Sequence, residues 1–154
     1  MNRLLLIAAI LAAVTSAAAL SVASASGWRA APTVTVATRQ TALGRILTDG
    51  RGLTLYLFEK DTHGRSNCSG ACATYWPPLL TRLKPTAGGG ARRSLLGVIR
   101  RSDGLEQVTY GGHPLYRYLP DTKPGQVAGQ DSQLFGAAWY VLSPSGAKIE
   151  RGGS

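Results

Sequence analysis

Two copies of one short motif carry side chains that could bind a ligand in this chain of 154 residues. Each copy places two aromatic residues and one aspartate at the same spacing: Tyr56, Phe58 and Asp61 in the first copy, and Tyr116, Tyr118 and Asp121 in the second. If these side chains converge, their aromatic faces suit a sugar ring and their carboxylates suit a cation. The structural alternative is that each aspartate ends a strand and accepts backbone N–H groups two residues on. The residue types leave both interpretations open.

A second group of reactive side chains lies only in the first half of the chain, with the spacing His63-x4-Cys68-x3-Cys72. Two cysteines of an exported protein are expected to oxidise. In a helical turn their Cα atoms would lie about 6 Å apart, which is within disulfide range. We therefore predict a Cys68–Cys72 disulfide and no cofactor. The alternative is a copper site that uses His63, Cys68 and Cys72, because two thiolates and an imidazole suit Cu(I).

The first 25 residues predict export. A single cation, Arg3, precedes an uncharged apolar run that ends in Ala23-Ser24-Ala25. This pattern is typical of a signal peptide cleaved after Ala25, and it indicates a secreted or cell-envelope protein. The alternative is an uncleaved anchor, because the apolar run is about long enough to cross a bilayer. No cysteine follows the run, so a lipid-modified amino terminus is not expected.

The charge of the chain predicts anionic partners. Lys and Arg number 17 against 8 Asp and Glu, which gives a formal net charge of +9. A basic surface attracts anions without choosing among them. The chain has no zinc-finger spacing, basic helix or RNA-binding aromatic signature, so nucleic acid is not the expected partner. We expect anionic cell-envelope polymers or a membrane surface instead.

The composition favours many turns and short strands. Nineteen Gly and eight Pro separate short runs of Val, Ile, Thr and Tyr. We predict strands within 31–40, 43–48, 53–58, 95–100, 107–110, 113–119, 139–143 and 147–149. One short helix is expected near 68–76, capped by Ser66 or Asn67 and ended by Pro77-Pro78. The Asp49-Gly50 turn predicts that 53–58 pairs back on 43–48. The expected class is all-β, as a mainly antiparallel small sandwich or barrel.

The motif belongs to a longer internal repeat. Residues 55–62 and 115–122 are identical at four of eight positions with an offset of 60, and Trp76 corresponds to Trp139 after a three-residue shift. We therefore expect one domain over 26–154, with repeat one at about 43–80, a linker at 81–94 and repeat two at about 95–149. Because side chains alternate along a strand, the motif aromatics should face one side and the leucines the other. The two aromatic pairs are then expected to stack across a pseudo-two-fold axis.

These features resemble a bacterial family of secreted repeat proteins and predicted lipoproteins with a Yx(F/W/Y)xxD motif. The supporting residues are Cys68-x-x-x-Cys72 before Trp76-Pro77-Pro78-Leu79, then Gln107-Val108-Thr109-Tyr110 and Trp139-Tyr140-Val141. The resemblance implies export and brings no agreed chemistry. Many members carry a lipidation cysteine, which this chain lacks. We expect a non-catalytic cell-envelope or extracellular binding or structural module; a periplasmic-type copper-binding or thiol-redox protein is the alternative.

Overall fold

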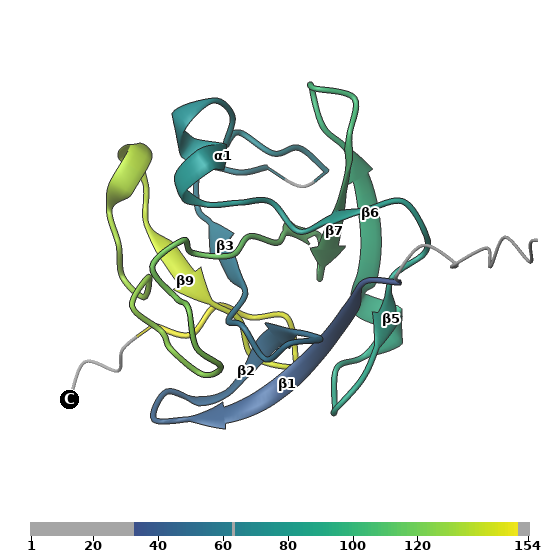
Figure 1. Ribbon diagram of the computed structural model, residues 1–154, viewed down its shortest axis with the longest axis vertical. Helices are drawn as coiled ribbons and strands as arrows, with labels where there is room; N and C mark the ends of the chain where they lie inside the picture. The colour runs from purple at the N-terminus through teal and green to yellow at the C-terminus, as the bar shows by residue number, and fades with distance from the viewer. Residues whose placement is uncertain (1–32, 63, 151–154) are drawn as a thin grey trace, which may run out of the picture.

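The computed structural model describes residues 33–62 and 64–150. The predicted signal peptide at 1–25 lies outside the described residues, as does His63. No helix within the described ranges is both long and apolar enough to cross a membrane. Figure 1 shows β1 and β2 at the bottom of the view, β6 and β7 at the right, and α1 at the top.

The first sheet pairs the strands predicted within 31–40 and 43–48 with each other, a pairing that was not predicted. Strand β1 (Thr35–Thr41) pairs antiparallel with β2 (Gly44–Asp49) from Val36 to Thr41. The other edge of β1 pairs in parallel with β5 (Thr86–Ala87). This short strand lies inside the 81–94 segment, so that segment packs on the domain it connects.

A second sheet joins the two halves of the chain. Strand β3 (Tyr56–Phe58) pairs antiparallel with β9 (Trp139–Val141). The predicted pairing of 53–58 on 43–48 is confirmed only next to the turn, where Thr48 bridges Thr54 and the Leu55 amide donates to the Leu47 carbonyl at 3.1 Å. Beyond that bridge the edge of β2 binds the second repeat instead, because the Leu47 amide donates to the Leu142 carbonyl at 2.9 Å.

The third sheet is built mainly from the second repeat. Its strands lie in the order β4 (Leu80–Thr81), β7 (Glu106–Tyr110) and β6 (Leu96–Arg100), and β8 (His113–Pro114) also pairs with β7. The strands predicted at 95–100 and 107–110 are confirmed as β6 and β7, which pair antiparallel.

The helical segments of the described chain are short: α1 (Ala71–Tyr75), η1 (Arg93–Leu95) and η2 (Leu134–Gly136). The helix predicted near 68–76 is confirmed as α1, but the predicted cap is wrong. Gly70 occupies the N-cap position and no side chain caps the helix. The Ser66 and Asn67 side chains bind elsewhere: the Ser66 hydroxyl hydrogen-bonds with the Tyr116 hydroxyl, and the Asn67 side-chain amide donates to the Lys60 carbonyl.

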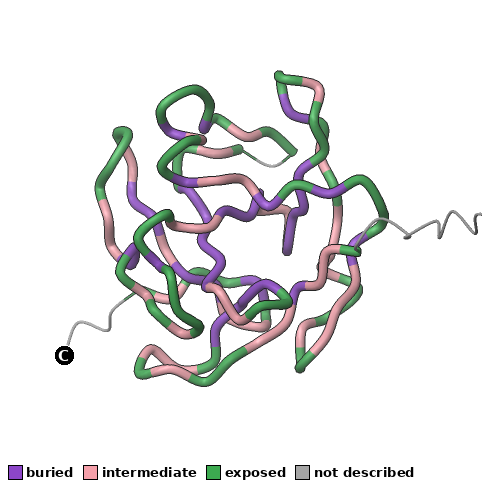
Figure 2. Tube along the Cα trace, in the orientation of Figure 1, coloured by how far each residue is buried: buried purple, intermediate pink, exposed green. Residues whose placement is uncertain are grey.

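The buried side chains form two clusters, and Figure 2 shows them along the central part of the trace. Alternation along the motif strands assigns side chains to the clusters as predicted. Leu55, Leu57 and Leu115 belong to an aliphatic cluster, whereas Tyr56 and Tyr116 belong to an aromatic one. The all-β, mainly antiparallel class is confirmed, and the sheets do not close into a barrel.

Candidate functional site

The motif tyrosines and aspartates pair reciprocally between the two repeats. The Tyr56 hydroxyl of repeat one donates to Asp121 Oδ2 of repeat two, with an oxygen–oxygen distance of 2.5 Å. The Tyr116 hydroxyl of repeat two donates to Asp61 Oδ2 of repeat one at 2.6 Å. Each motif therefore supplies a donor to the other copy and receives one from it.

A pseudo-two-fold axis passes between the two tyrosines. The Tyr56 amide donates to the Tyr116 carbonyl at 2.8 Å, and the Tyr116 amide donates to the Tyr56 carbonyl at 3.0 Å. This is the closely hydrogen-bonded pair of an antiparallel ladder. Because the two residues are 60 positions apart, the structural symmetry has the same offset as the sequence repeat.

The second oxygen of each motif carboxylate holds a loop. Asp61 Oδ1 accepts the Asn67 amide at 2.6 Å, and Asp121 Oδ1 accepts the Ala128 amide at 3.0 Å. These amides lie six and seven residues downstream, rather than the two residues predicted for an Asx-type turn. Both carboxylates therefore bridge a loop of their own repeat to a tyrosine of the other repeat.

Four aromatic rings stack in one column across the same axis. The order is Phe58, Trp139, Trp76 and Tyr118, with successive ring-centroid distances of 4.1, 3.9 and 4.2 Å. The two tryptophans are nearly parallel, at 4°. Each outer ring therefore rests on the tryptophan of the opposite repeat, as offset or stacked aromatic pairs do in well-packed cores.

Burial raises the pKa values of three side chains of the motif. Burial and the adjacent carboxylate raise the pKa of Tyr56, beside Asp121, and of Tyr116, beside Asp61. Burial also raises the pKa of Asp61, although the Asn67 amide and the Tyr116 hydroxyl oppose the shift. Both phenols consequently stay neutral donors across the physiological range.

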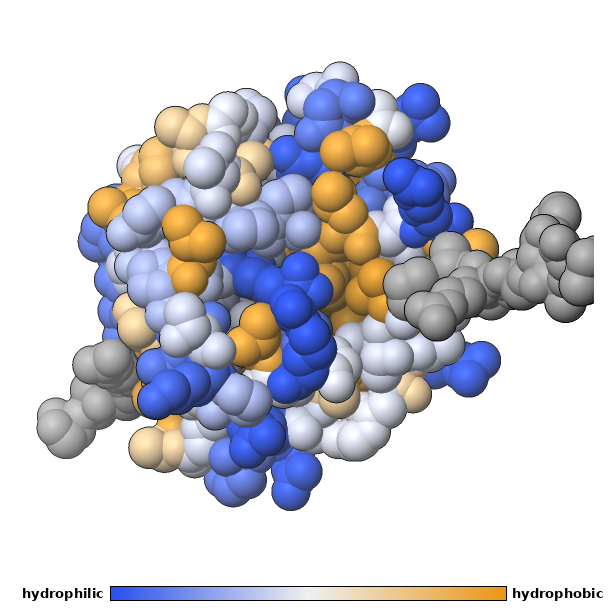
Figure 3. Space-filling view, in the orientation of Figure 1, coloured by the Kyte–Doolittle hydropathy of each residue, from blue (hydrophilic) through white to orange (hydrophobic). Residues whose placement is uncertain are grey.

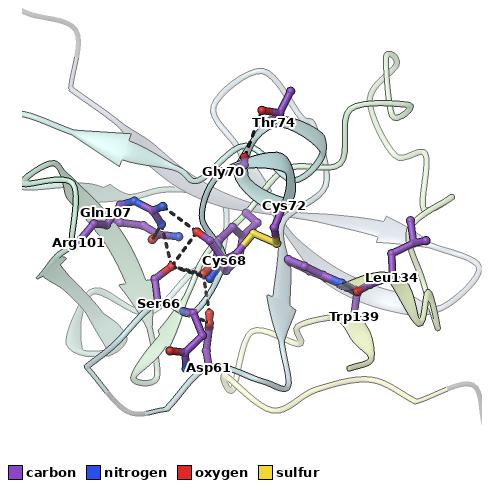
Figure 4. Close-up of a disulfide and its surroundings, with 12 residues drawn as sticks. Asp61, Ser66, Cys68, Gly70, Cys72, Thr74, Arg101, Gln107, Leu134 and Trp139 are labelled. Carbon is purple, nitrogen blue, oxygen red and sulfur yellow. Dashed lines mark hydrogen bonds between the residues drawn. A yellow bond between two sulfur atoms is a disulfide. The ribbon is translucent and has the colours of Figure 1, made fainter. Parts of the chain in front are cut away.

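The predicted disulfide is present. Cys68 and Cys72 are bonded, with their Cα atoms 5.2 Å apart, and both are buried. In Figure 4 the Arg101 and Gln107 side chains approach the disulfide from one side, and Trp139 lies on the other. The disulfide thus packs between a polar network and the aromatic column.

A buried cation organises that polar network. The Arg101 side chain is 2% exposed and forms an ion pair with Asp103 at 3.1 Å. Its Nη1 donates to Ser66 Oγ and to Gln107 Oε1, both at 2.7 Å, and its Nη2 donates to the Cys68 carbonyl at 2.8 Å. This arginine anchors the unshared loop of repeat one onto repeat two.

Arg101 is absent from the sequence-derived candidates, and its place in the repeat follows from the backbone hydrogen bonds of the two turns. In the first turn the Asp49 amide donates to the Leu53 carbonyl, and in the second the Arg101 amide donates to the Leu105 carbonyl. The two residues are structural equivalents, and both are buried. Asp49 pairs with Arg117 at 2.7 Å, so the two turns place opposite charges at the same buried position.

The proposed copper ligands are only partly described. Cys68 and Cys72 are bonded to each other, and His63 lies outside the described residues. Among residues 33–62 and 64–150, no three His, Cys, Asp or Glu side chains gather in a way that could hold a metal ion. Copper binding through two thiolates would require this disulfide to be reduced.

A protein-family comparison matches both halves of the chain. The matching family is described as a secreted repeat of unknown function, and its two matches cover residues 37–80 and 97–143. The chain belongs to this secreted-repeat family. No curated protein and no solved structure matches.

The secreted-repeat matches agree with the observed symmetry. The first match runs from β1 through the start of β4, and the second runs from β6 to just beyond β9. Each match therefore contains one motif and one stacked tryptophan. The description of the family as secreted supports an exported protein.

Proposed function

We propose that the protein is an exported, non-catalytic module of the cell envelope in which the repeated motif holds the fold together and the basic surface binds anionic partners. The reciprocal Tyr–Asp pairing is the observation that carries this proposal. The donors and acceptors that a motif-based ligand site would need are instead engaged with each other. Ligand binding then falls to residues outside the motif.

The distribution of charge supports an anionic partner. Residues 62–102 contain seven Lys and Arg and no Asp or Glu. All of these cations except Arg101 are exposed. A surface of this kind attracts polyanions, with an affinity that falls as salt rises.

Binding to a soluble polyanion tests the proposal. The exported protein is titrated with polyglycerol phosphate between 50 and 200 mM NaCl, roughly the range over which screening becomes strong. We expect binding that weakens as salt rises and is no weaker in a folded Asp61→Asn/Asp121→Asn variant, which carries two fewer negative charges. Absence of binding to the polyanion would overturn the proposal.

Two results would favour the alternatives. Binding of a neutral saccharide or a divalent cation that disappears in Asp61→Ala and Asp121→Ala, with near-UV circular dichroism intact, would make the motif a ligand site. Two free thiols in the native protein, together with copper uptake, would favour the copper-binding alternative of Cys68, Cys72 and His63.

A further inference from the structure

One groove on the surface combines apolar side chains with unpaired cations. It has a volume of about 300 Å³ and lies between the chain that enters β5 and the start of β6. Its lining residues are Lys84, Pro85, Thr86, Arg93, Leu96, Gly97 and Val98. Figure 3 shows apolar side chains gathered over β6 and β7, in a hollow with hydrophilic side chains beside it.

The apolar part of this face is exposed. Val98 is 40% exposed on β6, and Leu83, next to the groove residue Lys84, is 46% exposed. Exposed apolar surface beside a groove is typical of an interaction site. A soluble polyanion would need the cations but would gain nothing from these two side chains.

The charged part of this face is uncompensated. Lys84 and Arg93 are exposed and have no ion-pair partner within the described part of the chain. The flanking cations Arg82, Arg92 and Arg100 are exposed as well. Acidic residues are missing from the groove lining.

The chain also enters the domain at this groove. The Thr86 amide donates to the Val34 carbonyl at 2.9 Å, so the first described residues lie beside the groove. The predicted leader or anchor at 1–25 precedes them. A domain still attached to a membrane through that segment would present this face near the lipid.

We propose that this face, formed by the groove residues and Leu83, docks on a bilayer that contains anionic lipid. The apolar side chains enter the interface between headgroups and acyl chains, while Lys84 and Arg93 meet the lipid phosphates. This inference rests on the proposed function, because it names the anionic partner of the basic surface.

Vesicle co-sedimentation tests the docking face. The exported protein is mixed with vesicles of phosphatidylglycerol and phosphatidylcholine, and separately with pure phosphatidylcholine vesicles. We expect binding to the anionic vesicles and little to the neutral ones. Leu83→Gln/Val98→Thr should weaken binding about tenfold, from the loss of buried apolar surface. Lys84→Gln/Arg93→Gln should weaken it by about fivefold for each cation.

A matched control uses the side of the molecule that carries η2, which lies across from β5 and β6 in Figure 1. Leu134 lies in η2 and is 42% exposed, and Leu119, whose amide donates to the Tyr75 carbonyl at the end of α1, is 56% exposed. Leu119→Gln/Leu134→Gln should leave vesicle binding unchanged, as should Arg45→Gln/Lys123→Gln. Because Val98 is partly exposed and Thr keeps its shape and strand preference, the test variant should remain folded.

Several outcomes would overturn the docking proposal. Equal binding to neutral and anionic vesicles would indicate an apolar anchor. Loss of binding only in the Lys84→Gln/Arg93→Gln variant would indicate attraction by charge alone. Loss of binding in the Leu119→Gln/Leu134→Gln control would show that the opposite face contacts the bilayer. Polyglycerol phosphate binding without vesicle binding would refute the docking face and leave the proposed function standing, whereas failure of both would refute both.

Discussion

At the scale of single residues, the motif works through partners that lie in the other repeat. Tyr56 is fully buried and its hydroxyl has one strong acceptor, Asp121. A buried carboxylate that loses a donor keeps the cost of its desolvation. The two Tyr–Asp pairs therefore stabilise contact between the repeats rather than the turn inside each one.

The swapped pairing predicts which double mutants couple. Tyr56→Phe should lower the free energy of unfolding by about 2 kcal/mol, because a hydrogen bond to a charged group is lost. In a double-mutant cycle, Tyr56→Phe should couple with Asp121→Asn by at least about 0.5 kcal/mol. The losses of unfolding free energy caused by Tyr56→Phe and by Asp61→Asn should be nearly additive. Chemical denaturation measures both cycles, and stronger coupling within a repeat than between repeats would contradict the pairing.

Asp49 predicts a loss of stability in acid. Burial opposes ionisation of Asp49, but the Leu53 and Arg51 amides and the Arg117 guanidinium lower its pKa below 3.8. A lowered folded-state pKa contributes stability above the unfolded value and loses it as pH falls through the folded value. At neutral pH we expect the free energy of unfolding of the wild type to be about 2 kcal/mol higher than that of Asp49→Asn. This difference in unfolding free energy should disappear as pH falls below 3.8. A difference that urea unfolding finds to be independent of pH would contradict the lowered pKa of Asp49.

At the scale of elements, the unshared loop of repeat one is held from three sides. Its disulfide closes the turn before α1, Asp61 accepts the Asn67 amide, and Arg101 donates to the Cys68 carbonyl. The second repeat has no cysteine counterpart, and its corresponding loop is held by Asp121 and the Ala128 amide. The disulfide therefore adds a local constraint to a framework that both repeats share.

The disulfide predicts no reactive thiol in the native protein and a modest effect of its removal. Thiol titration of the folded chain should find no free cysteine. Cys68→Ala/Cys72→Ala should lower the free energy of unfolding by about 2 kcal/mol, because so short a loop removes little entropy from the unfolded chain. Denaturation of the variant measures this loss. A variant that fails to fold would mean that the disulfide holds more than the local turn.

At the scale of the whole molecule, the two repeats share one aromatic cluster and one sheet. The column of Phe58, Trp139, Trp76 and Tyr118 alternates between repeats, and β3 of repeat one pairs with β9 of repeat two. Neither half can complete its aromatic cluster without the other. The contacts between the two repeats therefore contribute to the stability of the whole domain, and an isolated repeat would lack them.

This arrangement predicts a single unfolding transition. Tryptophan fluorescence reports the contact between repeats, because Trp76 stacks on Trp139, whereas far-UV circular dichroism reports the strands. The two probes should give the same denaturant midpoint. Two separated transitions, or a folded isolated repeat, would show that the halves are stable by themselves.

Much of the architecture followed from local patterns in the sequence. Alternation along the strands predicted that leucines and motif aromatics would enter different clusters, and strands β6 and β7 came from two short runs around a turn. The position of α1 came from its Pro-Pro stop, whereas its cap could not be predicted. Ser66 and Asn67 are good capping residues, but the Ser66 hydroxyl bonds to Tyr116 and the Asn67 side-chain amide donates to the Lys60 carbonyl, so neither side chain caps α1.

The repeat itself could be determined from the sequence, because an offset of 60 relates Tyr56 to Tyr116 and Asp61 to Asp121. Only the tertiary structure decided that each tyrosine binds the aspartate of the other copy. Each tyrosine lies five residues before the aspartate of its own copy, whereas its hydrogen-bond partner lies 65 residues away for Tyr56 and 55 residues away for Tyr116. The local pattern contains only the short spacing and does not show the pairing between copies. The distinction comes from the antiparallel contact of Tyr56 with Tyr116, which turns one repeat against the other.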